Sequence, residues 1–328
     1  MLDLYKLEIF QKVAGEGSIS KAAERLLLTQ PAVSQHVRDL EGALGVELFS
    51  RGRRGVTLTP AGETLLDYTR CILRMVTEAE SAVANVQELS QGQIRIGATP
   101  GASTYLLPEW VQSFHDRFPS LKVLLSTDET DAIADAIGAG TLDIGIVEGD
   151  RIRSERASSL HLQAIESFVV VGPGHPWWER GEISLEMLDN QPFLATSQGS
   201  QSRQWLDNNL AQHQVQVHVV AEYDNMEAIK RSVRAGMGIA ILPGCAIWQE
   251  QEAGTLRALA IQGALIERTL KLVWAKALPF KPITRAFLAH LAEWYPHLGK
   301  IIPPGSNLDL KLPRPLQMAR PESFNCSG

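Results

Sequence analysis

The chain has 328 residues, of which 45% are hydrophobic and 21% are charged, and its formal net charge is −6. That length suits two or three domains, and the composition is that of a globular protein. No apolar run approaches the roughly 18 residues of a membrane-spanning helix, so we predict no membrane contact. The amphipathic first segment, residues 1–13, does not resemble a signal peptide and favours a cytoplasmic protein.

The cysteines argue against a metal site. Cys71, Cys245 and Cys326 lie far apart, and no cysteine or histidine spacing matches a zinc site. We interpret all three as structural thiols and expect no metal and no cofactor. A redox role for Cys245 is disfavoured, because no second cysteine lies near it in the sequence.

Three short helices are predicted at the start of the chain. Apolar residues recur at helical spacing over residues 3–14, and two glycines end that segment. Ser18 is placed to cap a second helix over 18–27, and Thr29 a third, which has Pro31 at its start. Two helices across a tight turn, with small polar groups facing outward on the second, are typical of a helix-turn-helix.

The third helix and the segment after it carry the residues that we expect to contact DNA. In a helix-turn-helix the start of the second helix enters the major groove, where Gln, Ser and small apolar side chains read base edges. Residues 46–60 are predicted to form two short strands around an Arg/Gly turn, a wing that concentrates positive charge. The alternative is a plain helical hairpin with a solvated face. The candidate DNA-binding residues are Ser18, Ser20, Gln30, Pro31, Ala32, Ser34, Gln35, Arg38, Arg51, Arg53 and Arg54.

A long helix is predicted after the wing, because no Gly or Pro occurs from Glu63 to Gln91. Mostly apolar residues alternate there at spacings of four and three, the seam that pairs two helices. A helix packed on its own domain would give the same pattern. The seam consists of Leu65, Thr69, Ile72, Val76, Ala79, Val83 and Val86.

From Gln93 onward predicted strands alternate with helices, which indicates α/β layers with a mainly parallel sheet. The strand candidates are QIRIGAT, LKVLLST, LDIGIVEG, FVVVGP, PFLATSQ, VQVHVVAEY, GIAILP, LRALAI and LKLVWAK.

Ligands in such folds bind at the carboxyl ends of strands, beside helix N-termini, where hydroxyls, N–H groups and an arginine suit an anion. An ordinary helix cap is the alternative for each loop alone. The candidate effector-binding residues are Thr99, Gly101, Ala102, Ser103, Glu148, Thr196, Gln198, Ser200, Ser202, Arg203, Asn225 and Glu227.

The opening of the chain resembles the LysR-type transcriptional regulators. The residues that carry the resemblance are Ser20, Ala22, Ala23, Leu26, Gln30, Pro31, Ala32, Val33, Ser34, Leu40, Glu41, Leu44, Gly45, Leu48, Phe49 and Arg51, together with Leu58–Gly62. The resemblance extends to about residue 300.

The resemblance implies a fold class and its domains. It implies a winged helix-turn-helix over 1–60, a dimerisation linker helix over 61–91 and a two-lobed α/β effector domain over 92–300, similar to periplasmic binding proteins. Lobe I would hold 92–164 and 266–300, lobe II would hold 165–265, and two crossover strands would join them. It also implies a homodimer, and commonly a homotetramer built from two such dimers. The proline-rich tail, 301–328, is expected to be disordered.

Within that family, the segment 225–243 resembles regulators of carbon-fixation and inorganic-carbon operons, which sense small phosphorylated or carboxylated metabolites. The second-lobe loop reads Gly199-Ser200-Gln201-Ser202-Arg203 where Gly-Ser-Gly-Thr-Arg is more common. It keeps the hydroxyls and the arginine, and Gln201 is expected to narrow the pocket.

Together these features predict a sequence-specific transcriptional regulator switched by a small, anionic effector. Its expected partners are double-stranded promoter DNA, further copies of itself and RNA polymerase. The alternative is a constitutive, architectural DNA binder with a vestigial ligand cleft. An enzyme is disfavoured, because the chain has no GxxxxGK[ST], GxSxG or HExxH motif. A solute-binding protein of a transporter is disfavoured by the predicted DNA reader and the missing signal pattern.

Overall fold

The computed structural model describes residues 2–52, 55–84, 92–149, 152–263, 266–276 and 280–302. The chain forms two compact units, Met1–Thr284 and Arg285–Gly328. Three predicted features lie outside the described residues: Arg53 and Arg54 of the wing, Val86 of the heptad seam, and the tail from residue 303.

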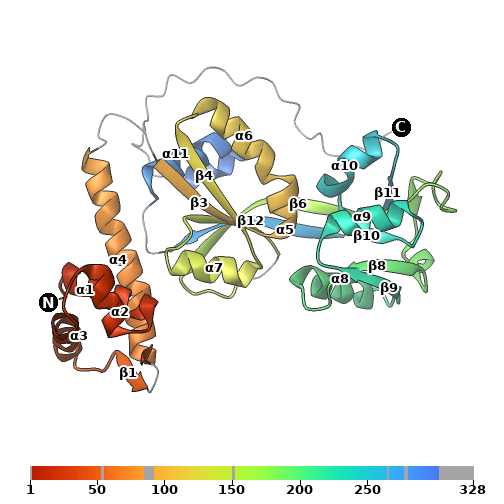
Figure 1. The fold of residues 1–328 in the computed structure, drawn as a ribbon. Coiled ribbons are helices and arrows are strands. Elements are labelled where there is room, and N and C mark those ends of the chain that lie inside the picture. Colours follow the sequence, from red (N-terminus) through yellow and green to blue (C-terminus); the bar gives the residue numbers. More distant parts are fainter. Residues whose placement is uncertain are drawn as a thin grey trace. The chain divides into compact units, whose positions relative to one another are not determined.

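The N-terminal reader, residues 2–58, has the predicted helices and wing. It consists of α1 (Leu4–Glu16), α2 (Ile19–Leu26), α3 (Gln30–Leu44), β1 (Phe49–Gly52) and β2 (Gly55–Leu58), with β1 antiparallel to β2 (Figure 1). Ser18 Oγ accepts a hydrogen bond from Lys21 N and Thr29 Oγ1 one from Ala32 N, which confirms both predicted N-caps.

The reader packs around one apolar cluster. Leu7, Phe10, Val33 and Leu40 are almost fully buried there, because the helical spacing of apolar residues turns one face of each helix inward. The wing is joined closely to the helices at Gly55, which has a φ of +136° and where an added Cβ would lie 2.3 Å from Gly17 O. Only glycine meets both requirements at that position.

The linker helix α4 (Pro60–Ala84) follows the wing directly. Leu65 and Ile72 from the first half of the predicted seam, together with Leu66, pack against the apolar cluster of the reader. The first half of the seam is therefore explained by packing of the helix on its own domain, the alternative that the sequence left open. Pairing with a second copy of the chain stays a prediction for the remainder.

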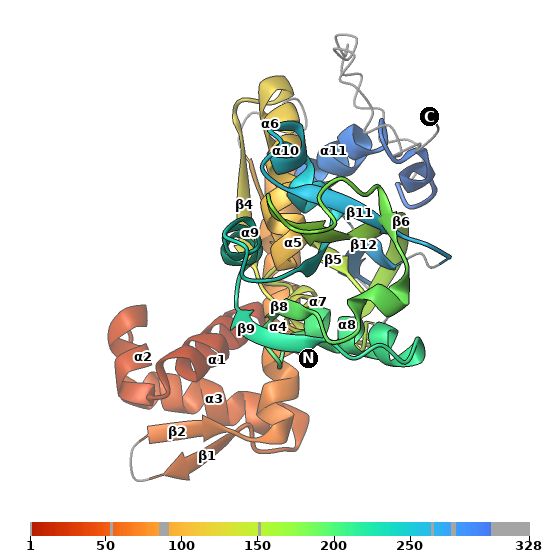
Figure 2. The same ribbon diagram turned by 90° about the vertical axis from the view of Figure 1, so that its right-hand side faces the viewer.

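Lobe I begins with three parallel strands. In the order β4–β3–β5, the strands β3 (Gly92–Ala98), β4 (Leu121–Thr127) and β5 (Ile144–Glu148) are accompanied by α5 (Pro100–Tyr105), α6 (Leu107–Arg117) and α7 (Thr130–Gly138). The sheet continues through β12 (Glu267–Ala275), which is antiparallel to β5 on one side and to β6 (Ala157–Val171) on the other. Figure 2 shows these long strands after a quarter turn.

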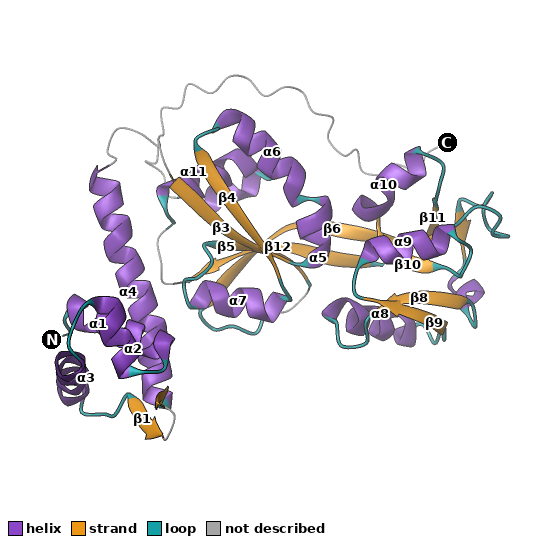
Figure 3. Ribbon diagram, viewed as in Figure 1, coloured by secondary structure: helices purple, strands orange, loops and turns teal. Residues whose placement is uncertain are grey.

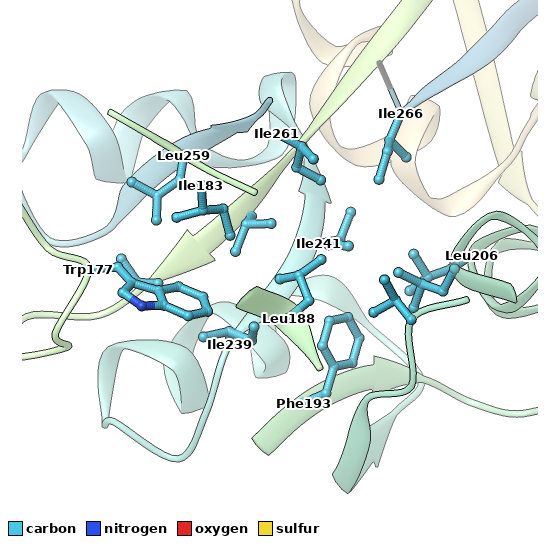
Figure 4. Close-up of a cluster of buried hydrophobic side chains, with 14 of the residues drawn as sticks. Trp177, Ile183, Leu188, Phe193, Leu206, Ile239, Ile241, Leu259, Ile261 and Ile266 are labelled. Carbon is cyan, nitrogen blue, oxygen red and sulfur yellow. The ribbon is translucent and has the colours of Figure 1, made fainter. Parts of the chain in front are cut away.

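Lobe II is built on the far half of β6. The strands β10 (Ala240–Pro243) and β11 (Arg257–Ile261) both pair with it, while β7 (Glu182–Ile183) pairs with β11, and β8 (Pro192–Thr196) with β9 (His218–Tyr223). The helical elements of this lobe are η1 (Leu185–Leu188), α8 (Gln201–Gln212), α9 (Met226–Arg234) and α10 (Gly244–Glu252), and Figure 3 shows how they alternate with strands. Figure 4 shows the main apolar cluster of this lobe, in which Trp177, Leu188 and Phe193 lie among isoleucines.

The prediction of a mainly parallel sheet was wrong, because the eight-stranded sheet is mixed. Both β6 and β12 run between the two lobes and pair antiparallel with each other, from Glu267 opposite Glu166 to Ala275 opposite Ala157. The sequence pattern located only part of each strand. The first eleven residues of β6, up to Ser167, and the first three residues of β12 are polar or irregular in sequence, and they escaped detection.

The second compact unit, described by itself, contains most of α11 (Pro282–Leu291) and the 3-10 helix η2 (Pro296–Lys300). Phe287, Leu291 and Leu298 are fully buried in it. Within the described part of the chain, no helix combines the length and apolar character needed to cross a membrane.

Candidate functional site

The outward face of α3 carries the residues predicted to read bases. Gln30, Pro31, Gln35 and Arg38 are exposed, and Ala32 and Ser34 are partly exposed beside them. Ser20 is exposed on α2, whereas the Ser18 hydroxyl is engaged as the cap of that helix. Arg51 lies on β1, next to the turn of the wing.

The polar side chains of this face form a chain of hydrogen bonds. Arg38 Nη2 donates to Gln35 Oε1 at 2.9 Å, and Gln35 Nε2 donates to Asp39 Oδ1 at 2.7 Å. Lys6 Nζ from α1 lies 3.1 Å from Asp39 Oδ2, and the hydrogen bonds from Gln35 and then Lys6 lower the pKa of the Asp39 carboxyl. Sequence reasoning missed Lys6 and Asp39, although Asp39 lies one helical turn after Gln35.

The lobe I part of the effector site lies where β3 and β5 end. Thr99 is buried at the start of α5, and its Oγ1 accepts a hydrogen bond from Glu148 N at 3.2 Å. An added Cβ at Gly101 would lie 2.2 Å from Glu148 Oε1, so the glycine makes room for this buried carboxylate. Ser103 Oγ lies 2.7 Å from Thr127 Oγ1. The structure thus brings together Thr99, Gly101 and Glu148 of the predicted residues, whereas Ser103 contacts Thr127, which was not predicted.

Arg268 on β12 connects this cluster to lobe II. Its Nη1 lies 2.9 Å from Glu148 Oε2 and 2.8 Å from Ser202 Oγ, and its Nη2 lies 3.2 Å from Glu148 O. Its guanidinium lies 5.4 Å from the centre of the Trp205 ring. Neither Arg268 nor Trp205 was predicted. The stretch that contains Arg268 is too polar to read as a buried strand.

The lobe II loop is organised by Ser200 and Arg203. Ser200 Oγ accepts a hydrogen bond from Arg203 N and so caps α8. Arg203 Nε lies 2.9 Å from Asp207 Oδ1, and its Nη1 lies 2.8 Å from Glu222 Oε1 and 3.1 Å from Thr196 O. Two carboxylates therefore already neutralise the arginine that was expected to bind the anion.

These contacts shift the acid–base equilibria of the loop. The hydrogen bond from Arg203 lowers the pKa of Glu222 against the effect of burial, and a backbone hydrogen bond from Gln198 acts in the same direction. Gln198 is thus linked to the site through its main chain. Burial opposes the charge of Arg203, but its two carboxylate partners raise the pKa of the guanidinium.

A second contact joins the lobes at the start of α9. Asn225 caps this helix by accepting from Ala228 N, and Tyr105 OH on α5 donates to Glu227 Oε1 at 2.8 Å. Burial opposes ionisation of Glu227, but hydrogen bonds from Lys230 and Tyr105 outweigh it and lower the pKa of this carboxyl. Burial and then the hydrogen bond to Glu227 raise the pKa of Tyr105.

Cys245 lies at the start of α10, close enough to Glu148 for that carboxylate to affect its ionisation. Burial and the charge of Glu148 raise the pKa of the thiol to about 12. The thiol is therefore protonated at neutral pH. A protonated thiol is a poor nucleophile, which agrees with a structural role.

Two family models match the chain. "Bacterial regulatory helix-turn-helix protein, lysR family" matches residues 4–63, and "LysR substrate binding domain" matches residues 87–296. The first match covers the reader and the start of α4. The second covers both lobes and every predicted effector-binding residue.

Similar proteins agree with these matches. A "Probable RuBisCO transcriptional regulator" of Trichormus variabilis is 34% identical over 277 residues, which cover 83% of this chain and 82% of the relative. Full-length CbnR complexed with its target DNA has a TM-score of 0.60 at 20% identity, covering 89% of this chain and 99% of CbnR. The CcmR regulatory domain of Synechocystis PCC6803 in complex with 2-PG has a TM-score of 0.57 at 24% identity, covering 62% and 98%.

Proposed function

This chain belongs to the LysR family of bacterial transcriptional regulators, and we propose that it changes its action on a promoter when it binds a small carboxylated or phosphorylated acid. It is a DNA-binding regulator with an effector-binding domain, and it is not an enzyme. The acid is the part of the function that we propose.

The observation that carries this proposal is the linkage of both lobes by one buried arginine. Arg268 contacts Glu148 of lobe I and Ser202 of lobe II, so a ligand that interacts with its guanidinium acts on both lobes at once. An effector shifts a conformational equilibrium only if it binds the two states with different affinity. The Arg268 guanidinium is held by Glu148 from lobe I and by Ser202 from lobe II. If the distance between these two residues differs between the two states, the guanidinium binds an effector with different affinity in each state.

The comparisons support an acid of the phosphoglycolate kind. The similarity to a probable RuBisCO transcriptional regulator and the 2-PG complex of the CcmR domain both fit the resemblance of residues 225–243 to carbon-fixation regulators.

We further propose that two copies pair through the second half of the α4 seam. Two readers then occupy two half-sites, and the effector alters contact with RNA polymerase.

The experiment uses the full chain and an operator selected from a random DNA pool. We expect 2-phosphoglycolate to change the DNase I footprint and the dissociation constant, and to raise the melting temperature by mass action. A melting temperature and a footprint unchanged across a panel of carboxylated and phosphorylated acids would contradict the proposal. They would favour the constitutive DNA binder instead.

A further inference from the structure

We propose that Arg268, rather than Arg203, anchors the acid group of the effector, through the edge of its guanidinium that carries Nε. This inference rests on the proposed function and names the group that recognises the ligand. Arg268 is 8% exposed and lies on a strand that runs between the lobes.

The other two buried cations of the site each hold two carboxylates. Lys230 Nζ lies 2.6 Å from Glu227 Oε1, 2.8 Å from Glu250 Oε1 and 2.9 Å from Ala246 O, which accounts for all three of its N–H bonds. Arg203 holds two carboxylates, of Asp207 and Glu222. An effector acid at either cation would therefore meet a positive charge that two carboxylates already compensate.

Arg268 differs because, among the described residues, it faces a single carboxylate, that of Glu148. Its Nη1 serves Glu148 and Ser202, and its Nη2 serves the main-chain oxygen of Glu148. Its Nε is buried and has no hydrogen-bond partner among the described residues. A buried N–H without an acceptor carries an uncompensated desolvation penalty. A ligand oxygen that accepts a hydrogen bond from Nε would remove that penalty.

The shape of the free edge defines the class of ligand. The Nε–H and one N–H of Nη2 point the same way, and this pair matches two oxygens of a carboxylate or phosphate. The guanidinium carbon of Arg268 lies over the Trp205 ring, 5.4 Å from its centre, and this cation–π contact helps to hold the pair in place. The effector is therefore an acid that presents two oxygens side by side.

The carboxylate of Glu148 competes with the effector acid for the positive charge of Arg268. Its carboxylate is 2% exposed and lies 2.9 Å from Nη1, so a bound anion on the neighbouring edge lies within a few ångströms of a second negative charge. Replacing that carboxylate by an amide of similar size removes the repulsion and keeps a hydrogen-bond acceptor. Glu148→Gln should therefore bind the acid more tightly than the wild type.

The test measures binding to the full chain by calorimetry, with 2-phosphoglycolate, glycolate and inorganic phosphate as probes. Single loss of Arg268 leaves Glu148 buried without its cation, so the decisive comparison is Glu148→Gln against Glu148→Gln/Arg268→Gln, in which both charges are absent. We expect Glu148→Gln to bind at least threefold more tightly than the wild type, and the double variant at least twentyfold more weakly than Glu148→Gln. Arg268→Lys, which keeps the charge without the planar edge, should bind at least tenfold more weakly than the wild type.

Arg257→Gln is the matched control, because Arg257 stacks on Trp178 at 5.6 Å in the same lobe and contacts no residue of the site in the described structure. It should bind within twofold of the wild type. The inference is overturned if the double variant binds within threefold of Glu148→Gln, or if Arg268→Lys binds like the wild type. If only Glu148→Gln binds the acids, the proposed function fails for the native chain while the anchor stands. If neither binds, both fail.

Discussion

The reader and the effector site both depend on arginine, glutamine and serine side chains, but they hold them in opposite ways. On α3 the functional groups are exposed and lie within residues 30–38, so one helix places them all. In the effector site Glu148 and Arg268 are buried and come from distant segments, 120 positions apart. Changes on the exposed face of α3 should therefore alter function alone, whereas changes to the buried Glu148–Arg268 pair should alter function and stability together.

The largest expected effect is the loss of the buried cation. Arg268→Met leaves Glu148 buried without a partner and should lower the free energy of unfolding by about 3–5 kcal/mol. All seven tryptophans lie beyond residue 92, so urea unfolding followed by tryptophan fluorescence reports on the effector module.

The matched change in the reader is Lys6→Met. It removes the exposed ion pair with Asp39, so we expect no resolvable change in the free energy of unfolding when the transition is followed by helical circular dichroism. If Arg268→Met and Lys6→Met lowered the free energy of unfolding by similar amounts, the proposed difference between the effector site and the reader would be wrong.

A second effect concerns DNA affinity without a change in stability. Gln35→Ala removes a side chain that we predict to read bases, and it should weaken binding to a selected operator by about 1–3 kcal/mol, with the loss confined to one or two base positions. Gln112→Ala is the control, because Gln112 donates to Asp116 at 2.8 Å as Gln35 does to Asp39 at 2.7 Å, but on α6. Competition binding against single-base operator variants measures both. A uniform loss across all sequences would assign Gln35 to the phosphates instead.

A third effect compares two helix caps of the same chemistry. Ser18→Ala and Ser200→Ala each remove a hydroxyl that accepts one main-chain N–H, and each should cost about 1 kcal/mol. Tryptophan fluorescence should detect the loss for Ser200→Ala only, while helical circular dichroism should detect both. Equal shifts in fluorescence would mean that reader and effector module unfold as one cooperative unit.

The smallest effect is a pH dependence at the second contact between the lobes. Because hydrogen bonds lower the pKa of Glu227 in the folded state, its contribution is present above the unfolded pKa of about 4.3 and is lost as the pH falls through the lower, folded value. Tyr105→Phe removes one of these bonds and should cost about 0.5–1.5 kcal/mol at pH 7. The difference from the wild type should shrink below pH 4.5 in urea unfolding. A difference that stays constant with pH would exclude this carboxyl as its source.

The reader was largely predictable because its signals are local. Caps at Ser18 and Thr29, a proline at the start of α3 and apolar residues at helical spacing determine these helices within a few residues. The loops of the effector site were predictable for the same reason, since Ser200 and Asn225 cap α8 and α9.

The pairing of Glu148 with Arg268 could not be predicted. It depends on the antiparallel return of β12 beside β5, which places Leu270 opposite Glu148, and nothing near Arg268 in the sequence indicates that register. Arg203 was expected to face a ligand, although Asp207, four positions further along α8, and Glu222 lie beside it. The Asp207 partner is a local signal that the sequence analysis missed.

The position of the Glu148–Arg268 pair has a consequence for how new specificities arise. The two residues flank lobe II in the sequence, and the segment 165–265 lies entirely between them. Recombination that exchanges this segment between two genes of the family keeps both charges and replaces their neighbours from lobe II, Ser202, Trp205 and Cys245. A single genetic exchange can thus deliver a new ligand preference without ever producing an intermediate that carries an uncompensated buried charge.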